Sequence, residues 1–241
     1  MKNKILQIRF LLFFLLIFSK VTSVAQVKSN EETKKTNTKT EIKTFLALGD
    51  SYTIGESVSV EERWPNILAR ELVPYDINLK EVNIVAKTGW TTDELMSYLI
   101  KTNISNNYNL VGLCIGVNNQ YRGRSEEEFR TQFSELLDMA IGYANNNVEN
   151  VFVLSIPDWS VVPFAEGRDL EKIQEEIRAY NKIKKEVTQQ KNCTFINITK
   201  TSRKAKYKKK YVAEDNLHFS GSMHELWVAE IIKKMNLDLS N

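Results

Sequence analysis

A serine, an aspartate and a histidine stand at positions from which they could together carry out acyl transfer. Ser51 follows the apolar run 45–48 and the turn residues Gly49-Asp50, so it would lie just beyond the end of a strand. Asp215 precedes His218 by three residues near the C-terminus. A serine hydroxyl is a weak nucleophile until a base removes its proton, and a histidine oriented by a carboxylate is such a base. Since the chain holds only two histidines, we predict that His218 is the base, oriented by Asp215.

The residues around Ser51 do not form the Gly-x-Ser-x-Gly elbow of the α/β-hydrolases. Four separated blocks appear instead, in a fixed order along the chain. They are Gly49-Asp50-Ser51, Lys87-Thr88-Gly89-Trp90, Gly116-Val117-Asn118-Asn119 and Asp215-Asn216-Leu217-His218. In these blocks the chain resembles the SGNH (GDSL) hydrolases, a family of serine esterases and lipases, and the resemblance covers nearly all of residues 44–237.

The resemblance implies a role for each block. Ser51 would attack the acyl carbonyl, and the oxyanion would be held by the backbone N–H groups of Ser51 and Gly89 and by the Asn118 amide. Glycine permits close backbone approach, and an amide is a donor that does not lose its proton. One residue departs from the family, because Asn119 stands where an aspartate is usual. We expect this change to alter loop order or substrate choice more than catalysis.

Short apolar runs alternate with longer amphipathic segments along the rest of the chain. We predict five strands, each apolar on both faces, at residues 44–48, 82–86, 110–115, 150–155 and 193–198. The segments between and after them carry helical signals: Pro65 at a first turn, the caps Thr91/Glu94 and Ser125/Glu128, and apolar stripes through Ile177 and Trp227.

This alternation predicts an α/β fold with a parallel sheet and helices on both faces. Together with the resemblance, it indicates a three-layer α/β/α sandwich with a five-stranded parallel sheet, the flavodoxin-like SGNH hydrolase fold. Ligands bind beyond the carboxyl ends of such strands, which is where the first three blocks fall.

The first 25 residues have the features of a secretory signal peptide. Basic residues precede the apolar run 10–18, and small residues stand at Ser23 and Ala25. The run is shorter than the roughly 20 residues that cross a bilayer, and an uncleaved anchor is the alternative. Residues 26–43 are polar, and we predict a disordered tether there. We therefore expect an exported protein, periplasmic or secreted, with its domain at 44–237.

Removal of residues 1–25 would remove four of the 33 basic side chains and no acid, leaving 29 basic against 30 acidic residues. This balance gives no support for nucleic-acid binding. One basic run stands out at residues 203–210, where Tyr207 interrupts the cations. We predict a solvated, flexible connector there, and the alternative is weak contact with an anionic surface, either phospholipid head groups or an acidic glycan.

Further residues near the expected crevice have plainer interpretations. We predict that Asp50 organises its turn through backbone hydrogen bonds, that Asp158 is a turn residue rather than a second acid, and that His224 has a surface or capping role. Three aromatic residues are candidates for lining the substrate site, with local packing as the alternative: Trp90, Trp159 and Phe164.

The two cysteines, Cys114 and Cys193, both fall in predicted strands, the third and the fifth. With another strand between them, we expect two free, buried thiols. We find no metal-ligand spacing, no phosphate-binding glycine loop and no dinucleotide fingerprint, and we expect neither a metal nor a cofactor. The default expectation for the oligomeric state is a monomer.

The main hypothesis is thus a cofactor-free serine esterase acting through an acyl-serine intermediate. Its substrate would be a small-molecule, glycan or lipid ester, and simple esters, thioesters, lysophospholipids and acetylated carbohydrates all fit. Two alternatives are an acyltransferase that uses the same three residues and a non-catalytic binding module on the same fold.

Overall fold

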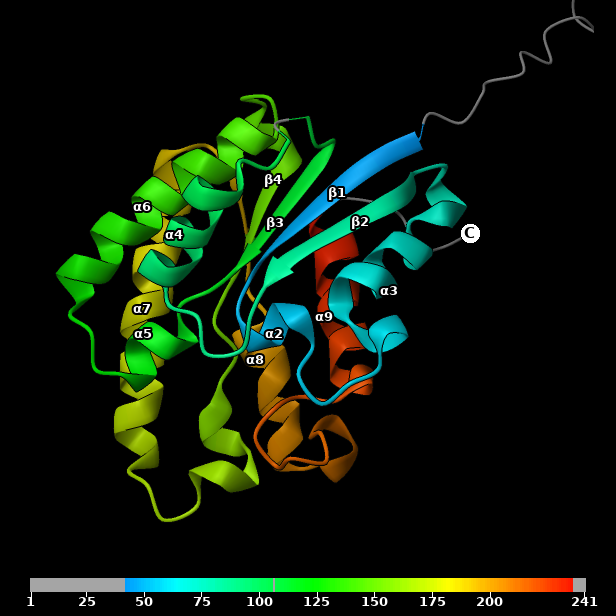
Figure 1. Cartoon of the computed structure of the whole chain (residues 1–241). Coiled ribbons are helices and arrows are strands. Elements are labelled where there is room, and N and C mark those ends of the chain that lie inside the picture. The colour runs from blue at the N-terminus through cyan, green and yellow to red at the C-terminus, as the bar shows by residue number, and fades with distance from the viewer. Residues whose placement is uncertain (1–41, 106, 236–241) are drawn as a thin grey trace, which may run out of the picture. The chain divides into compact units, whose positions relative to one another are not determined.

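Five parallel strands form the central sheet of the structure, a computed structural model that describes residues 42–105 and 107–235 (Figure 1). Their order across the sheet is β2-β1-β3-β4-β5, and each neighbouring pair is parallel. This is the flavodoxin-like order, so the predicted fold class is confirmed. The strands are β1 (Ile42–Gly49), β2 (Asn78–Ala86), β3 (Leu110–Cys114), β4 (Val151–Leu154) and β5 (Thr194–Ile196). The predicted signal peptide and nearly all of the predicted tether lie outside the described residues.

Five longer helices account for the amphipathic segments between and after the strands. Thr91 and Glu94 form the predicted capping box, and the Ser125 side chain accepts a hydrogen bond from the Glu128 backbone N–H at 3.1 Å. The helices are α3 (Trp64–Glu71), α4 (Thr92–Thr102), α6 (Glu126–Tyr143), α7 (Leu170–Gln190) and α9 (Gly221–Lys234).

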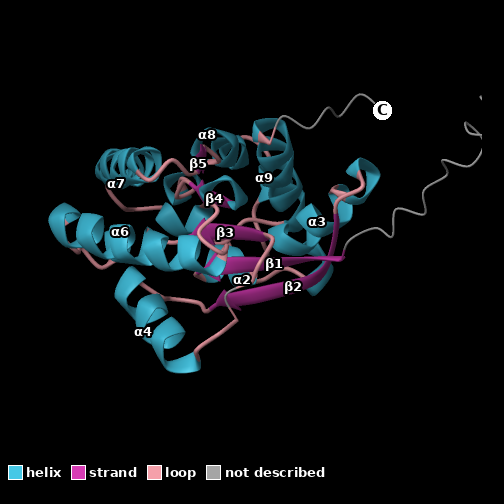
Figure 2. Ribbon diagram, turned by 90° about the horizontal axis from the view of Figure 1, so that it is seen from above, coloured by secondary structure: helices cyan, strands magenta, loops and turns pink. Residues whose placement is uncertain are grey.

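The helices form two layers, one on each face of the sheet. Viewed from above, α4, α6 and α7 lie on one side, whereas α3 and α9 lie on the other (Figure 2). Burial on both faces explains the continuous apolar sequence of the inner strands. Residues 45–48 of β1 are completely buried, and the rings of Phe45, Trp64 and Phe152 pack within 6.2 Å of one another, centroid to centroid.

Two strands begin earlier than their apolar runs indicate. β1 starts at Ile42, inside the segment predicted as a tether, and β2 starts at Asn78 rather than at residue 82. The first half of β2 contains Lys80 and Glu81, which face solvent because β2 lies at the edge of the sheet. These polar residues form a strand because they pair with β1, and an apolar pattern in the sequence does not identify them.

Cys114 ends β3 and Cys193 directly precedes β5, and both are buried and free. β4 lies between these two strands, as expected. Among the described residues, no helix has both the length and the apolar character that crossing a membrane would require.

His224 does not have the predicted surface role. Its side chain is only 1% exposed, its Nδ1 lies 3.1 Å from the carbonyl oxygen of Glu62, and its ring stacks on Trp227 at 4.7 Å between centroids. Burial lowers the pKa of His224 to about 3. The residue is therefore a neutral core histidine, whose Nδ1–H donates to the Glu62 carbonyl and joins α9 to the segment before α3.

This burial predicts how His224 affects stability in acid. Between about pH 6.5 and about pH 3 the unfolded chain binds a proton at His224 that the folded chain does not, so His224 lowers the free energy of unfolding by up to about 1.4 kcal/mol per pH unit as the pH falls. In His224→Gln this contribution is absent. Urea unfolding of both proteins at about pH 7 and about pH 4.5 measures it. If the difference in unfolding free energy between the two proteins is equal at both pH values, the assignment is wrong.

Candidate active site

The short helix α2 (Ser51–Ile54) begins directly at the predicted nucleophile, where β1 ends. Asp50 caps this helix, since its Oδ1 accepts the Tyr52 backbone N–H at 3.0 Å, which confirms its predicted role in the turn. Gly49 permits the tight junction. A Cβ at Gly49 would lie 2.2 Å from the backbone oxygen of Cys114 and equally close to the Thr53 side chain. Ser51 is thus held between the ends of β1 and β3.

A buried lysine lies behind this turn, and nothing in the sequence motifs indicated it. Lys184 of α7 is completely buried, and its Nζ donates to the Ile115 carbonyl at 2.7 Å. Burial raises the pKa of Asp50 to about 7, while the Tyr52 N–H and the positive charge of Lys184 act against this rise. Burial likewise lowers the pKa of Lys184 to about 8, against the influence of Cys114 and Asp50. Lys184 therefore supplies counter-charge to Asp50 and anchors the segment that follows β3.

The other half of the predicted constellation is a tight loop near the C-terminus. The His218 Nδ1 lies 2.5 Å from Asp215 Oδ2, and the other oxygen of Asp215 accepts the backbone N–H groups of Leu217 and His218 at 2.9 and 2.8 Å. The Ser57 hydroxyl also donates to Asp215 Oδ2, at 2.6 Å. Burial raises the pKa of Asp215, but the hydrogen bonds from Ser57 and His218 outweigh it and hold the pKa well below its ordinary value.

The imidazole of His218 is also fixed by packing. The Tyr52 ring meets it edge to face at 5.8 Å between centroids, and Tyr52 itself packs on Phe219 and Trp227. Tyr52 follows Ser51 directly in the chain. Tyr52 therefore links the turn that carries Ser51 to the ring of His218.

The second and third sequence blocks meet beside this turn. Gly89 has φ +87°, a backbone conformation that favours glycine, and its carbonyl accepts a hydrogen bond from Arg122 at 2.7 Å. Asn118 lies in the short helix α5 (Val117–Tyr121), and its Nδ2 donates to the Trp90 carbonyl at 3.0 Å. This contact uses one of the two amide hydrogens, so the other is available to a ligand.

Asn119 is completely buried and links α5 to the start of α4. Its Oδ1 accepts the Thr92 backbone N–H at 3.1 Å, and its Nδ2 donates to the Thr92 hydroxyl at 2.8 Å. The Thr92 hydroxyl in turn donates to Gln132 at 2.5 Å. An ionised carboxylate at position 119 has no hydrogen to donate, so the amide fits this chain of hydrogen bonds.

A pocket of about 170 Å³ brings several of the predicted residues together. Of the predicted residues, it contains Ser51, Asn118, Trp159, Phe164 and His218, while Asp215 stands behind His218. The sequence analysis missed four lining residues, which carry no separate motif: Tyr52, Val117, Tyr121 and Leu217.

Of the three candidate aromatic residues, Trp90 is the one that does not line this pocket. Its ring packs on Tyr98 at 5.0 Å between centroids, which is the local packing that the alternative described. Trp159, in contrast, lines the pocket and is oriented by a 2.9 Å hydrogen bond from its Nε1 to Gln120.

Asp158 is a turn residue, as predicted, and is not a second acid in the pocket. It is fully buried, caps the turn Trp159–Val161, and forms an ion pair with Arg203 at 2.7 Å. The cations of the basic run that begins with Arg203 are exposed to solvent, as predicted, but the run has regular structure. It folds into two 3-10 helices, Arg203–Lys206 and Lys209–Tyr211, with Ala205 and Tyr211 buried.

Within residues 42–105 and 107–235, no group of three His, Cys, Asp or Glu side chains could hold a metal ion.

A hydroxyl, an amide and an imidazole backed by a carboxylate are the groups that acyl transfer to serine requires, and here they surround one small pocket. Several solved structures of esterases and lipases have the same fold. A member of the lipolytic protein G-D-S-L family from Veillonella parvula superposes with a TM-score of 0.60 at 17% identity, covering 81% of this chain and 99% of that one.

Two further structures are similar. The lipase/acylhydrolase from Enterococcus faecalis gives a TM-score of 0.58 at 23% identity, with 82% of this chain and 99% of that one covered. Axe2, an acetylxylan esterase from Geobacillus stearothermophilus, gives 0.64 at 15% identity, with 81% and 95% covered. At these identities the similarity shows a common fold. No curated protein matches the sequence.

The fold and the four sequence blocks define a hydrolase of the GDSL class. The chain matches the GDSL-like Lipase/Acylhydrolase family over residues 47–226, and it belongs to that family. It is accordingly a carboxylic ester hydrolase.

The buried Lys184 generates a prediction about stability. In Lys184→Met, Asp50 loses its counter-charge and keeps its proton to a higher pH than in the wild type. The variant should then be destabilised more at about pH 7.5, where wild-type Asp50 is largely ionised and Lys184 is largely charged, than at about pH 6, with a loss of about 3 kcal/mol at the higher pH, since breaking a buried ion pair costs this much.

Urea unfolding at the two pH values measures the loss. Lys185→Met is the matched control, because Lys185 is the exposed neighbour on the same helix, and its effect should be small at both pH values. A loss of stability in Lys184→Met that is the same at both pH values would contradict the proposed pairing.

Proposed function

We propose that the protein is an exported serine esterase that removes short acyl groups through an acyl-Ser51 intermediate. The observation that carries this proposal is the contact between His218 Nδ1 and Asp215, made in a loop that brings His218 into one pocket with Ser51. Because Nδ1–H donates to the carboxylate, Nε2 is left to accept the proton of Ser51.

In the first half-reaction Ser51 Oγ attacks the carbonyl carbon and His218 takes its proton. The oxyanion is stabilised by the backbone N–H groups of Ser51 and Gly89 and by the free hydrogen of the Asn118 amide. The tetrahedral intermediate then collapses, His218 returns the proton to the leaving alcohol, and the acyl group remains on Ser51. In the second half-reaction His218 activates a water molecule, and the acyl-enzyme is hydrolysed to the acid and free Ser51.

The small pocket favours a short acyl group. Its volume of about 170 Å³ lies below the roughly 300–1,000 Å³ that is usual for small-molecule pockets. Trp159 and Phe164 narrow it from one side, and Arg168 lies over the Phe164 ring at 4.6 Å. The similar fold of an acetylxylan esterase supports acetyl esters as the substrate class. Membership in a family of hydrolases favours water over a second alcohol as the acceptor.

Removal of the nucleophile tests the mechanism. Ser51→Ala should lower kcat for 4-nitrophenyl acetate by about 10⁴-fold or more, and Asp215→Asn should lower it by about 10⁴-fold through loss of the correct histidine tautomer. A fluorophosphonate probe should label the wild type and leave Ser51→Ala unlabelled. Full esterase activity in Ser51→Ala, with wild-type folding by circular dichroism, would exclude the mechanism.

The acyl preference is measured with a series of 4-nitrophenyl esters. We expect kcat/KM to be highest for acetate and to fall by about 100-fold at octanoate, since a long chain exceeds the pocket. Trp159→Ala enlarges the pocket and should raise the octanoate-to-acetate ratio. A wild-type preference for octanoate would rule out the short-acyl assignment while leaving the Ser51 mechanism standing.

A further inference from the structure

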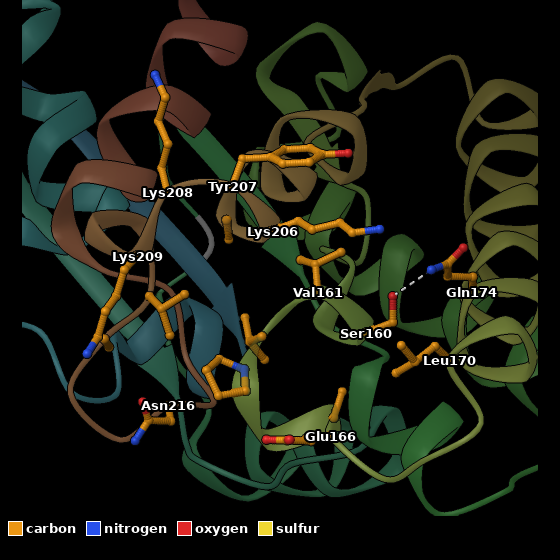
Figure 3. A pocket seen from close by; sticks show the side chains of 16 residues that line it. Ser160, Val161, Glu166, Leu170, Gln174, Lys206, Tyr207, Lys208, Lys209 and Asn216 are labelled. Carbon is orange, nitrogen blue, oxygen red and sulfur yellow. Dashed lines mark hydrogen bonds between the residues drawn. The ribbon is translucent and has the colours of Figure 1, made fainter.

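A second, larger cavity has a volume of about 690 Å³ and is drawn in Figure 3. Val161, Pro163 and Ala213 contribute apolar groups to its lining, and Ser160 and Gln174 add polar groups. We call it the basic groove, because Lys206, Lys208 and Lys209 form one side of it.

The basic groove and the Ser51 pocket share one wall. The segment 159–165 turns Trp159 and Phe164 toward the pocket and Ser160, Pro163 and Ala165 toward the groove. The loop that carries His218 is divided in the same way, with Leu217 in the pocket and Asn216 in the groove. A 3.0 Å hydrogen bond from the Phe164 backbone N–H to the Asn216 carbonyl joins the two segments. A ligand in the groove is therefore one layer of residues away from the pocket that holds Ser51.

The charge of the basic groove is strongly one-sided. Three lysines line it against a single acid, Glu166. Within the part of the chain that the structure describes, none of the three lysines forms an ion pair. In Figure 3 the Lys206 side chain extends toward the side of the groove on which Gln174 lies, while Lys208 and Lys209 point outward along the rim. One cation can thus meet a ligand inside the groove, and two more extend the positive field around its mouth.

The backbone that carries the three lysines is held in place by buried neighbours and hydrogen bonds. Ala205 and Tyr211 are buried on either side of them, and the Ser220 hydroxyl donates to the Lys210 carbonyl at 2.6 Å. Arg203, just before the lysines, is fixed by its ion pair with Asp158. Between them, the Tyr207 ring is 80% exposed and presents an aromatic face beside Lys206.

We propose that the basic groove binds the alcohol part of the ester, and that this part is an acidic polysaccharide. The inference rests on the proposed function, because it assigns the short acyl group to the Ser51 pocket and the sugar chain to the groove. A carboxylate on one sugar meets Lys206, carboxylates on neighbouring sugars meet Lys208 and Lys209, and Tyr207 offers its ring to a sugar face.

The size and form of the groove favour a glycan over a membrane surface. A volume of about 690 Å³ falls in the range of clefts that hold a ligand, and the flat surface of a bilayer does not fill such a cleft. The polar groups of Gln174 and Asn216 are suited to sugar hydroxyls. The wide groove and the narrow pocket also match an ester whose alcohol part is large and whose acyl part is small.

The test compares three acetyl esters: 4-nitrophenyl acetate, acetylated xylan and acetylated polygalacturonate. The first reports on the Ser51 pocket alone, and the two polymers differ in charge. We expect kcat/KM for the anionic polymer to exceed that for the neutral one by about 10-fold at low salt, and we expect this ratio to approach 1 as salt screens the lysines.

The combined variant Lys206→Gln, Lys208→Gln and Lys209→Gln should abolish that preference by raising KM for the anionic polymer by about 10-fold. The matched control replaces three exposed lysines elsewhere, Lys80, Lys101 and Lys233, with glutamine and should keep the wild-type ratio. An unchanged ratio in the groove variant would overturn the proposal.

Binding is measured independently of catalysis. Ser51→Ala protein should bind unacetylated polygalacturonate in calorimetry, and the same protein with the three groove lysines replaced should not. This readout still decides the role of the groove if the wild type fails to hydrolyse 4-nitrophenyl acetate, which would refute the esterase proposal alone. If the groove variant loses binding to phosphatidylserine vesicles but binds polygalacturonate as before, the basic face contacts lipid and the glycan assignment is wrong.

Discussion

The position of β1 in the sheet is the constraint on which the site depends. β1 pairs with β2 along one edge and with β3 along the other, and the chain passes to opposite faces of the sheet on either side of it. At such a reversal the loops after the strands diverge and leave a crevice. Ser51 follows β1, and Asn118 follows β3, so both enter the same crevice. The junction is tight enough that only glycine fits at position 49.

The charged groups around Ser51 differ in how far they are buried. Asp50 and Lys184 are fully buried, which disfavours their charged forms and makes the pair costly for folding. Asp215 is partly exposed, and four hydrogen bonds stabilise its charge. The buried pair holds the ends of β1 and β3, whereas Asp215 acts on the His218 ring. The buried pair behind Ser51 therefore lowers the stability of the fold, whereas the Asp215 carboxylate beside His218 stays ionised.

The positions of the inner strands in the chain and the helix caps could be predicted because their causes are local. Apolar runs mark the inner strands, and Thr91 with Glu94 completes a cap within one turn. The edge strand β2 was found only in part, because half of it is polar and becomes a strand through pairing with β1. His224 was placed wrongly for a similar reason: a polar residue on an amphipathic helix is buried here only because the Glu62 carbonyl meets it from another segment.

The sequence by itself determined which residues are candidates for the chemistry, since Ser51, Gly89, Asn118, Asp215 and His218 stand in recognisable blocks. The tertiary structure alone decided what supports and surrounds them. Lys184 comes from a segment far from these blocks, whereas Ser57 and Tyr121 follow the first and third blocks closely but carry no motif of their own. All three residue types are common on helices and in loops. Cavities are formed by segments distant in the chain, so neither the small pocket nor the basic groove exists until the segments 159–165 and 203–218 pack against each other. Short-range patterns record local structure and motifs, whereas burial and cavity shape arise from contacts between distant residues.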